Sequence, residues 1–181
     1  VTDGMSDYEI AKALHDYLAL NNEYEMRYYS GGMPYVSYTA YGALVNRTSV
    51  CAGYALAYER LMEQVGIPCE YVTGMTTRGS YAWNIIRIDG EWYHVDVTWE
   101  DPIGSNDYGF DKLRNKYINL EDSQIKGVNY HHDWQPDSIS ADGTDYGPEV
   151  VAQYLESGEI DTSLGESLED TMDDFFDSDS N

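Results

Sequence analysis

The stretch SYAWNIIRIDGEWYHVDVTWEDP, from Ser80 to Pro102, decides the fold. Strand-forming residues flank Asp89-Gly90, the dipeptide typical of a tight type I′ hairpin turn. The pattern predicts two antiparallel strands, over residues 82–88 and 91–98. Asp96 is unusual in the second strand, because aspartate is depleted in strands. What this carboxylate faces decides whether the chain performs chemistry.

The hairpin register predicts the surroundings of Asp96. Counting outward from a two-residue turn pairs Ile88 with Glu91 and places Trp83 opposite Asp96. Because side chains alternate between the two faces of a sheet, residue 81 then lies diagonally across from Asp96 on the same face. A residue at position 81 and the Asp96 carboxylate are therefore expected to be neighbours.

A first helix is predicted near the start of the chain. Ser6 and Glu9 fit a capping box, in which each side chain bonds the backbone amide of the other. Apolar residues recur at helical spacing over 10–18, and Asn21-Asn22 closes the run.

A second helix is predicted from about Val50 to Val65. Thr48 or Ser49 is expected to cap it, and Gly66 with Pro68 ends it. Further strands are expected over 70–73 and 117–120, and a short helix over 150–155. A helix that packs on an antiparallel sheet gives an α+β fold class.

Cys51, in SVCAGYALAYERL, stands at the predicted start of the second helix. Free amides and the helix dipole favour a thiolate there, and Ala52 and Gly53 leave room for a substrate. The alternative is a small buried thiol with a structural role. Cys69 is the other cysteine; the two are able to form one disulfide, and neither belongs to a zinc motif.

A nucleophilic cysteine needs a base, and the base needs an orienting acid. Asp96 suits the orienter, and position 81 is where the base is expected. That position holds Tyr81.

The ordered motifs resemble the transglutaminase-like superfamily, of papain-like fold. They are a cysteine that opens a helix, then GIP, AWN, WYHVD and TW, with YGALVN and YINLEDSQI on either side. The resemblance implies a Cys–His–Asp triad for acyl transfer on glutamine side chains or hydrolysis of amide bonds. It makes Cys51 the nucleophile and Asp96 the acid.

The family usually reads HAWN where this chain reads YAWN, so Tyr81 replaces the catalytic histidine. A phenol with a pKa near ~10 is a poor proton acceptor at neutral pH, and loss of a triad member costs several orders of magnitude in rate. His94, two residues before Asp96 on the same face, is the best substitute base, although family members with the usual histidine also carry it. His131 and His132, in NYHHDW, are able to fold back over the site, but an adjacent pair of histidines is more typical of a surface loop than of a ligand or base. A further hypothesis is that Tyr81 was introduced in place of a natural histidine.

Three more residues are candidates for the substrate site. Trp83 is expected in a core or cleft wall. Tyr41 and Tyr54 are candidates for the second oxyanion donor beside the Cys51 amide. No cofactor or metal is expected, because no calcium loop or zinc motif is present.

Charge limits the classes of partner. The 181 residues carry a formal net charge of −23, with no basic residue after Lys126. Such a surface repels phosphate backbones and anionic lipid, so nucleic acid is not expected as a partner. No run is long and apolar enough to insert into a membrane.

Three regions are predicted: a transglutaminase-like domain over 1–137, a peripheral extension over 138–160 and an acidic tail or linker over 161–181. The 18 tyrosines and few lysines resemble secreted bacterial proteins, so an extracellular or cell-surface location is expected. The start at Val1 indicates a processed or excised chain.

The main hypothesis is a catalytically impaired module that binds a protein or peptide or has a structural role. The alternative is an active cysteine acyltransferase or peptidase that uses Cys51, Asp96 and a substitute histidine.

Overall fold

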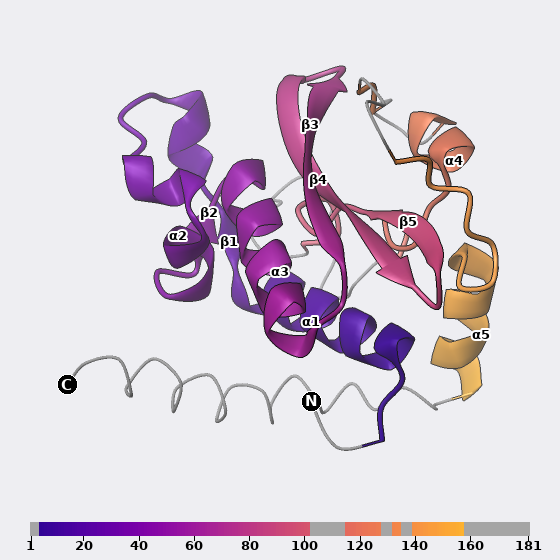
Figure 1. Cartoon of the computed structure of the whole chain (residues 1–181). Coiled ribbons are helices and arrows are strands. Elements are labelled where there is room, and N and C mark those ends of the chain that lie inside the picture. The colour runs from indigo at the N-terminus through magenta and orange to yellow at the C-terminus, as the bar shows by residue number, and fades with distance from the viewer. Residues whose placement is uncertain (1–3, 102–114, 128–131, 135–138, 158–181) are drawn as a thin grey trace.

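The computed structural model describes residues 4–101, 115–127, 132–134 and 139–157 (Figure 1). In chain order the elements are α1 (Asp7–Asn21), β1 (Glu23–Tyr24), η1 (Met26–Tyr29), η2 (Tyr35–Tyr38), α2 (Ala40–Leu44), β2 (Thr48–Ser49), α3 (Cys51–Val65), β3 (Cys69–Thr76), β4 (Gly79–Ile88), β5 (Glu91–Val95), α4 (Asp122–Gly127) and α5 (Pro148–Ser157). The predicted α+β class is confirmed, since the cysteine-bearing helix α3 packs on an antiparallel sheet of β3, β4 and β5.

Helix α1 begins as its sequence predicts. The Ser6 hydroxyl accepts the Glu9 amide, and the Glu9 carboxylate accepts the Ser6 amide at 2.7 Å. These two bonds satisfy backbone donors that the first helical turn leaves unpaired.

The cap predicted for the second helix is wrong. Val50 is the N-cap of α3 and provides no side-chain hydrogen bond. Thr48 and Ser49 instead form β2, which pairs in parallel with β1, and the Ser49 hydroxyl accepts a bond from Asn22 at 2.8 Å. The predicted end is confirmed, because Gly66 adopts the left-handed conformation at φ 77°.

The hairpin register is confirmed. Ile88 pairs with Glu91, and the ladder runs back to Asn84 opposite Val95, so its continuation brings Trp83 opposite Asp96. Asp89 and Gly90 both have positive φ, as a type I′ turn requires. β5 ends earlier than predicted, at Val95, and Asp96 lies just beyond the ladder.

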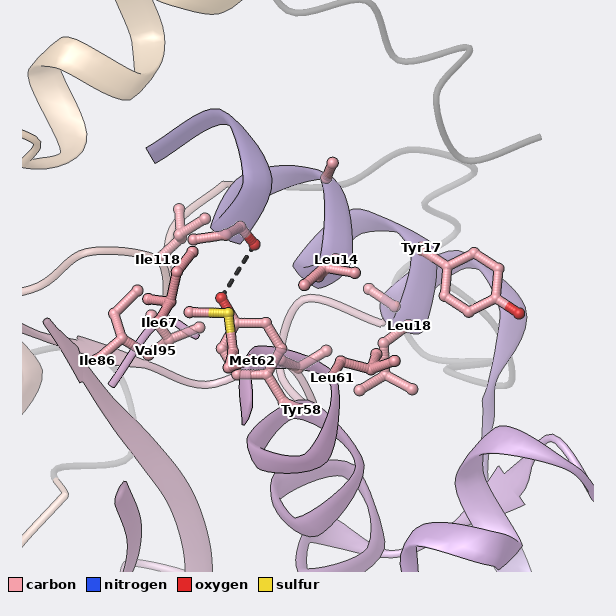
Figure 2. Close-up of a cluster of buried hydrophobic side chains, with 14 of the residues drawn as sticks. Leu14, Tyr17, Leu18, Tyr58, Leu61, Met62, Ile67, Ile86, Val95 and Ile118 are labelled. Atoms are coloured by element: carbon pink, nitrogen blue, oxygen red, sulfur yellow. Dashed lines mark hydrogen bonds between the residues drawn. The ribbon is translucent and has the colours of Figure 1, made fainter. Parts of the chain in front are cut away.

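The main core lies between α1, α3 and the face of the sheet that α3 covers (Figure 2). Tyr58 of α3 is fully buried, and its hydroxyl donates to the Ala11 carbonyl of α1 at 3.0 Å. The labelled members of the cluster in Figure 2 are Leu14, Tyr17, Leu18, Tyr58, Leu61, Met62, Ile67, Ile86, Val95 and Ile118. Burial of these side chains is the largest favourable contribution to the fold.

A second, smaller core is mainly aromatic. Trp83 and Trp134 are its largest members, and Tyr117, Leu120 and Ile125 complete the buried set. The predicted strand over 117–120 is reduced to one bridge, between His94 and Leu120. This core therefore joins β4 and β5 to segments that follow residue 114.

Gly74 permits a close crossing on the sheet. Met75 and Asp133 exchange two backbone hydrogen bonds, at 2.7 and 2.8 Å. A Cβ atom on Gly74 would lie 2.3 Å from the Asp133 carbonyl oxygen and 2.7 Å from the Trp83 ring. Residues 132–134 can lie against β3 only because position 74 has no side chain.

The short C-terminal helix forms, over Pro148–Ser157 rather than 150–155. The predicted tail over 161–181 and the boundary at residue 137 lie outside the described residues.

We expect Gly74→Ala to lower the free energy of unfolding by about 2 kcal/mol, because overpacking a tight site typically costs about 1–3 kcal/mol. Urea denaturation measures the change. Gly127→Ala is the matched control, since a Cβ there meets nothing within 4 Å. Equal stability of the two variants would contradict the crossing.

Candidate active site

Cys51 is the first residue of α3 and is partly buried. The backbone amides of Ala82 in β4, of Ala52 and of Cys51 itself favour its thiolate form and lower the pKa of Cys51. The predicted space at Gly53 is not open to substrate, because a Cβ there would lie 2.6 Å from the Ser49 Cβ and 2.9 Å from the Ser37 carbonyl oxygen.

The Cys51 thiol is protonated at neutral pH. Burial raises the pKa of Cys51 to about 11, and the charge of Asp96 adds to the rise. The amides of Ala82, Ala52 and Cys51 oppose it without reversing it. The helix start therefore does not produce the thiolate that position alone predicts. Cys69 is also a free thiol, so the two cysteines do not form a disulfide.

The Asp96 carboxylate is fully buried and receives hydrogen bonds from three parts of the chain. The Tyr81 hydroxyl donates to Oδ1 at 3.1 Å, and the Trp99 amide donates to the same oxygen at 3.3 Å. His132 Nε2 lies 2.8 Å from Oδ2. A buried carboxylate needs hydrogen-bond partners to replace the water that it loses, and these three groups are such partners.

Tyr81 is the neighbour of Asp96 that the register predicts. Burial and the charges of Asp96 and Cys51 hold the pKa of Tyr81 well above its usual range. The phenol therefore keeps its proton and donates a hydrogen bond to Asp96. It cannot act as a base for the thiol.

His132 is the site residue that sequence reasoning placed in a surface loop. It is 1% exposed and packs edge-to-face against three rings, with centroid distances of 4.8 Å to Trp99, 4.9 Å to Trp83 and 5.5 Å to Tyr81. The NYHHDW motif gave no signal for this contact, because it depends on the crossing at Gly74. His131 lies outside the described residues.

Both ring nitrogens of His94 have partners other than the thiol. Its Nδ1 accepts a bond from the Trp83 indole at 3.0 Å, and its Nε2 lies 2.9 Å from the Asp122 carboxylate. Burial lowers the pKa of His94 to about 4, although Asp122 acts in the opposite direction. Both ring nitrogens are thus occupied by structural partners, and His94 ties β5 to α4.

The two tyrosines considered for the oxyanion hole lie in different environments. Tyr54 is completely buried and its hydroxyl donates to Asp101, while Tyr41 is 59% exposed on α2. Trp83 is buried in the second core, with 1% of its surface exposed. Within the described residues, no three His, Cys, Asp or Glu side chains gather as a metal site requires. No described helix is long and apolar enough to cross a membrane.

Cys51 at the start of α3 and the buried Asp96 just after β5 are the two groups that the family resemblance assigns to a triad. The model described as the transglutaminase-like superfamily matches residues 1–97, more than half of the chain. The chain therefore belongs to the transglutaminase-like superfamily, and the predicted papain-like fold agrees with that membership.

Two proteins are similar in sequence to a limited region of this chain. Kyphoscoliosis peptidase from Mus musculus and from Homo sapiens is 34% identical over 61 residues, which cover 27% of this chain and 9% of each relative. The chain thus spans a small part of these proteins.

Two solved structures are also similar. One is a crystal structure of a TGase (TM-score 0.44, 19% identity, 49% of this chain and 25% of that one). The other is a putative cysteine protease from Cytophaga hutchinsonii (TM-score 0.43, 26% identity, 50% and 31%).

We expect iodoacetamide to label native Cys51 slowly below pH 9, since a pKa of about 11 leaves only ~1% of the thiol ionised at pH 9. The experiment uses Cys69→Ser, so that one thiol remains, and follows the mass of the intact protein. The same protein in urea is the control and should react as an ordinary thiol. Fast native labelling at pH 7 would contradict the protonated thiol.

His94 should make the fold sensitive to acid. Its pKa of about 4 in the folded state lies below the ordinary 6.5, so its contribution is complete above pH 6.5 and is lost as the pH falls toward 4. Between pH 7.5 and 5, the wild type should lose about 2 kcal/mol more than His94→Gln in urea denaturation. Parallel losses in the two proteins would contradict the prediction.

Proposed function

We propose that this chain is a transglutaminase-like domain with impaired acyl-transfer chemistry, which binds a protein or peptide or has a structural role in a secreted or surface bacterial protein. The observation that carries the proposal is the hydrogen bond from the Tyr81 hydroxyl to Asp96 at 3.1 Å. A phenol stands where the family resemblance requires the imidazole that activates the cysteine.

The state of the thiol supports the same conclusion. Acyl transfer needs the thiolate as nucleophile and a protonated base that then protonates the leaving group. Cys51 keeps its proton at neutral pH. Because the pKa of Tyr81 is raised, its phenol is also protonated and cannot accept the proton of the thiol. The two groups therefore cannot exchange a proton as a Cys–His pair does.

The binding role rests on tyrosines at the surface. Five tyrosines between residues 28 and 41 are 41% to 82% exposed: Tyr28, Tyr29, Tyr35, Tyr38 and Tyr41. Tyrosine combines a large apolar ring with a hydroxyl and has few rotatable bonds, which suits it to protein recognition. The secreted location has support only from the tyrosine-rich, lysine-poor composition.

The second candidate is an active cysteine acyltransferase or peptidase on glutamine or peptide amides. The observation that favours it is the contact of His132 with Asp96, which keeps an imidazole beside the carboxylate. In this candidate His132, rather than His94, is the histidine to test.

The experiment compares release of ammonia from a glutamine-containing peptide by the parent and by Tyr81→His. We expect the parent to match Cys51→Ala, and Tyr81→His to gain at least about a hundredfold in rate, because a missing triad member costs about 10⁴–10⁶ in rate.

Two controls make the result specific. Tyr81→Phe removes the hydroxyl without adding a base and should stay inactive, and Cys51→Ala in the Tyr81→His protein should abolish the gain. Turnover by the parent that needs Cys51 would overturn the proposal. Loss of that turnover in His132→Gln would then favour the second candidate.

A further inference from the structure

Exposed apolar side chains gather on one segment of the chain. Of the nine large apolar side chains that are exposed in the described residues, seven lie between positions 26 and 45. We call this set the tyrosine surface, and its members are Met26, Tyr28, Tyr29, Tyr35, Tyr38, Tyr41 and Val45. Contiguous apolar patches on a protein surface commonly mark interaction sites.

The elements that carry the tyrosine surface are held to one another and to α3. η1 and η2 share the buried carboxylate of Glu25, which accepts bonds from the Arg27 guanidinium at 2.6 and 2.8 Å and from the Ser37 hydroxyl at 3.1 Å. The Ser37 carbonyl accepts the Val50 amide at 2.9 Å, which fixes η2 to the start of α3. α2 packs against both η2 and α3, on the side of α3 away from the sheet (Figure 1). The surface is therefore preorganised for binding.

The tyrosine surface is nearly free of charge in a strongly acidic chain. Between residues 26 and 45 the only charged residue is Arg27, although the chain has 33 acidic residues and a net charge of −23. Glu25 neutralises the Arg27 guanidinium. A charged partner would lose hydration at this surface without gaining an ionic contact, so the contacting part of the partner must be uncharged. A second copy of the chain is disfavoured because two chains of charge −23 repel each other.

The make-up of the surface selects among the common modes of peptide recognition. Strand addition needs an unpaired strand edge, whereas six of the seven side chains stand on the helical elements η1, η2 and α2. Recognition of a phosphorylated or acidic motif needs a cluster of arginines, and positions 26–45 hold one. An amphipathic helix needs an apolar groove, but five of the seven side chains end in a hydroxyl.

Proline-rich segments suit such a surface. A polyproline II helix has no internal hydrogen bonds, so its carbonyls are free to accept bonds, and it loses little conformational freedom on binding. A tyrosine offers its ring to the apolar proline side chains and its hydroxyl as a donor to those carbonyls. Uncharged aromatic side chains are thus the surface that this kind of peptide requires.

We propose that the tyrosine surface binds an uncharged, proline-rich peptide segment in the polyproline II conformation. The rings form two pairs along the surface, Tyr28–Tyr29 with centroids 5.2 Å apart and Tyr35–Tyr38 with centroids 6.4 Å apart. The inference rests on the binding role in the proposed function and names the surface and the class of partner. It does not depend on the ionisation of Cys51 or Asp96.

The test measures the fluorescence anisotropy of fluorescein-labelled decaproline, an uncharged polyproline II helix, as the protein is added. We expect saturable binding by the parent. Tyr35→Ala and Tyr41→Ala should each bind at least about tenfold more weakly, because truncated aromatic anchors account for most of the loss at such contacts. Both side chains are exposed, at 82% and 59%, so their removal leaves the core intact.

Two controls make the result specific. Met75→Ala removes a 53% exposed apolar side chain outside the tyrosine surface and should bind decaproline as the parent does. A labelled decapeptide of alternating glycine and serine carries the same dye and no charge, but it is flexible, so it should not bind. Equal binding of the two peptides, or unchanged binding of decaproline by both tyrosine variants, would overturn the proposal.

Other occupants have their own readouts. If the parent binds chitohexaose but not decaproline, and the tyrosine variants lose that binding, the surface recognises a glycan. If the sedimentation coefficient of the parent rises with concentration and that of Tyr35→Ala does not, the surface joins two copies of the chain. Either result, or no decaproline binding at millimolar protein, refutes the inference. None of these measurements involves amide turnover, so their failure leaves the comparison of the parent with Tyr81→His unaffected.

Discussion

The site depends on one constraint: a carboxylate removed from water needs donors for both oxygens. Asp96 meets it with Tyr81 and the Trp99 amide on one oxygen and His132 on the other. These donors come from β4, the turn after β5 and a segment after α4. Satisfying one anion therefore joins three parts of the chain around the thiol.

The same arrangement links stability to chemistry. A phenol at position 81 serves the carboxylate as a donor, but it cannot move the proton of Cys51 at neutral pH. Burial, which builds the second core around Trp83, also keeps the thiol neutral and His94 unprotonated. The features that make this region well packed thus oppose the charged groups that acyl transfer requires.

Local patterns in the sequence predicted what is determined locally. The capping box at Ser6 and the turn at Asp89-Gly90 need only neighbours in the chain, and from that turn the register brings Tyr81 to Asp96. The predictions failed where a contact depends on segments that are far apart in the sequence. Ser49 does not cap α3, because its hydroxyl accepts a hydrogen bond from Asn22. His132 reaches Asp96 because residues 132–134 cross β3 at Gly74, and one glycine in a strand does not predict such a crossing.

That glycine has a consequence for reading related chains. At position 74 the methyl group of an alanine would occupy the space of a peptide bond, so the crossing strand segment and its imidazole would have to take another route. A larger side chain at position 74 and the Asp133 peptide cannot occupy the same space, so a related chain with such a residue cannot bring a histidine to its carboxylate by this crossing.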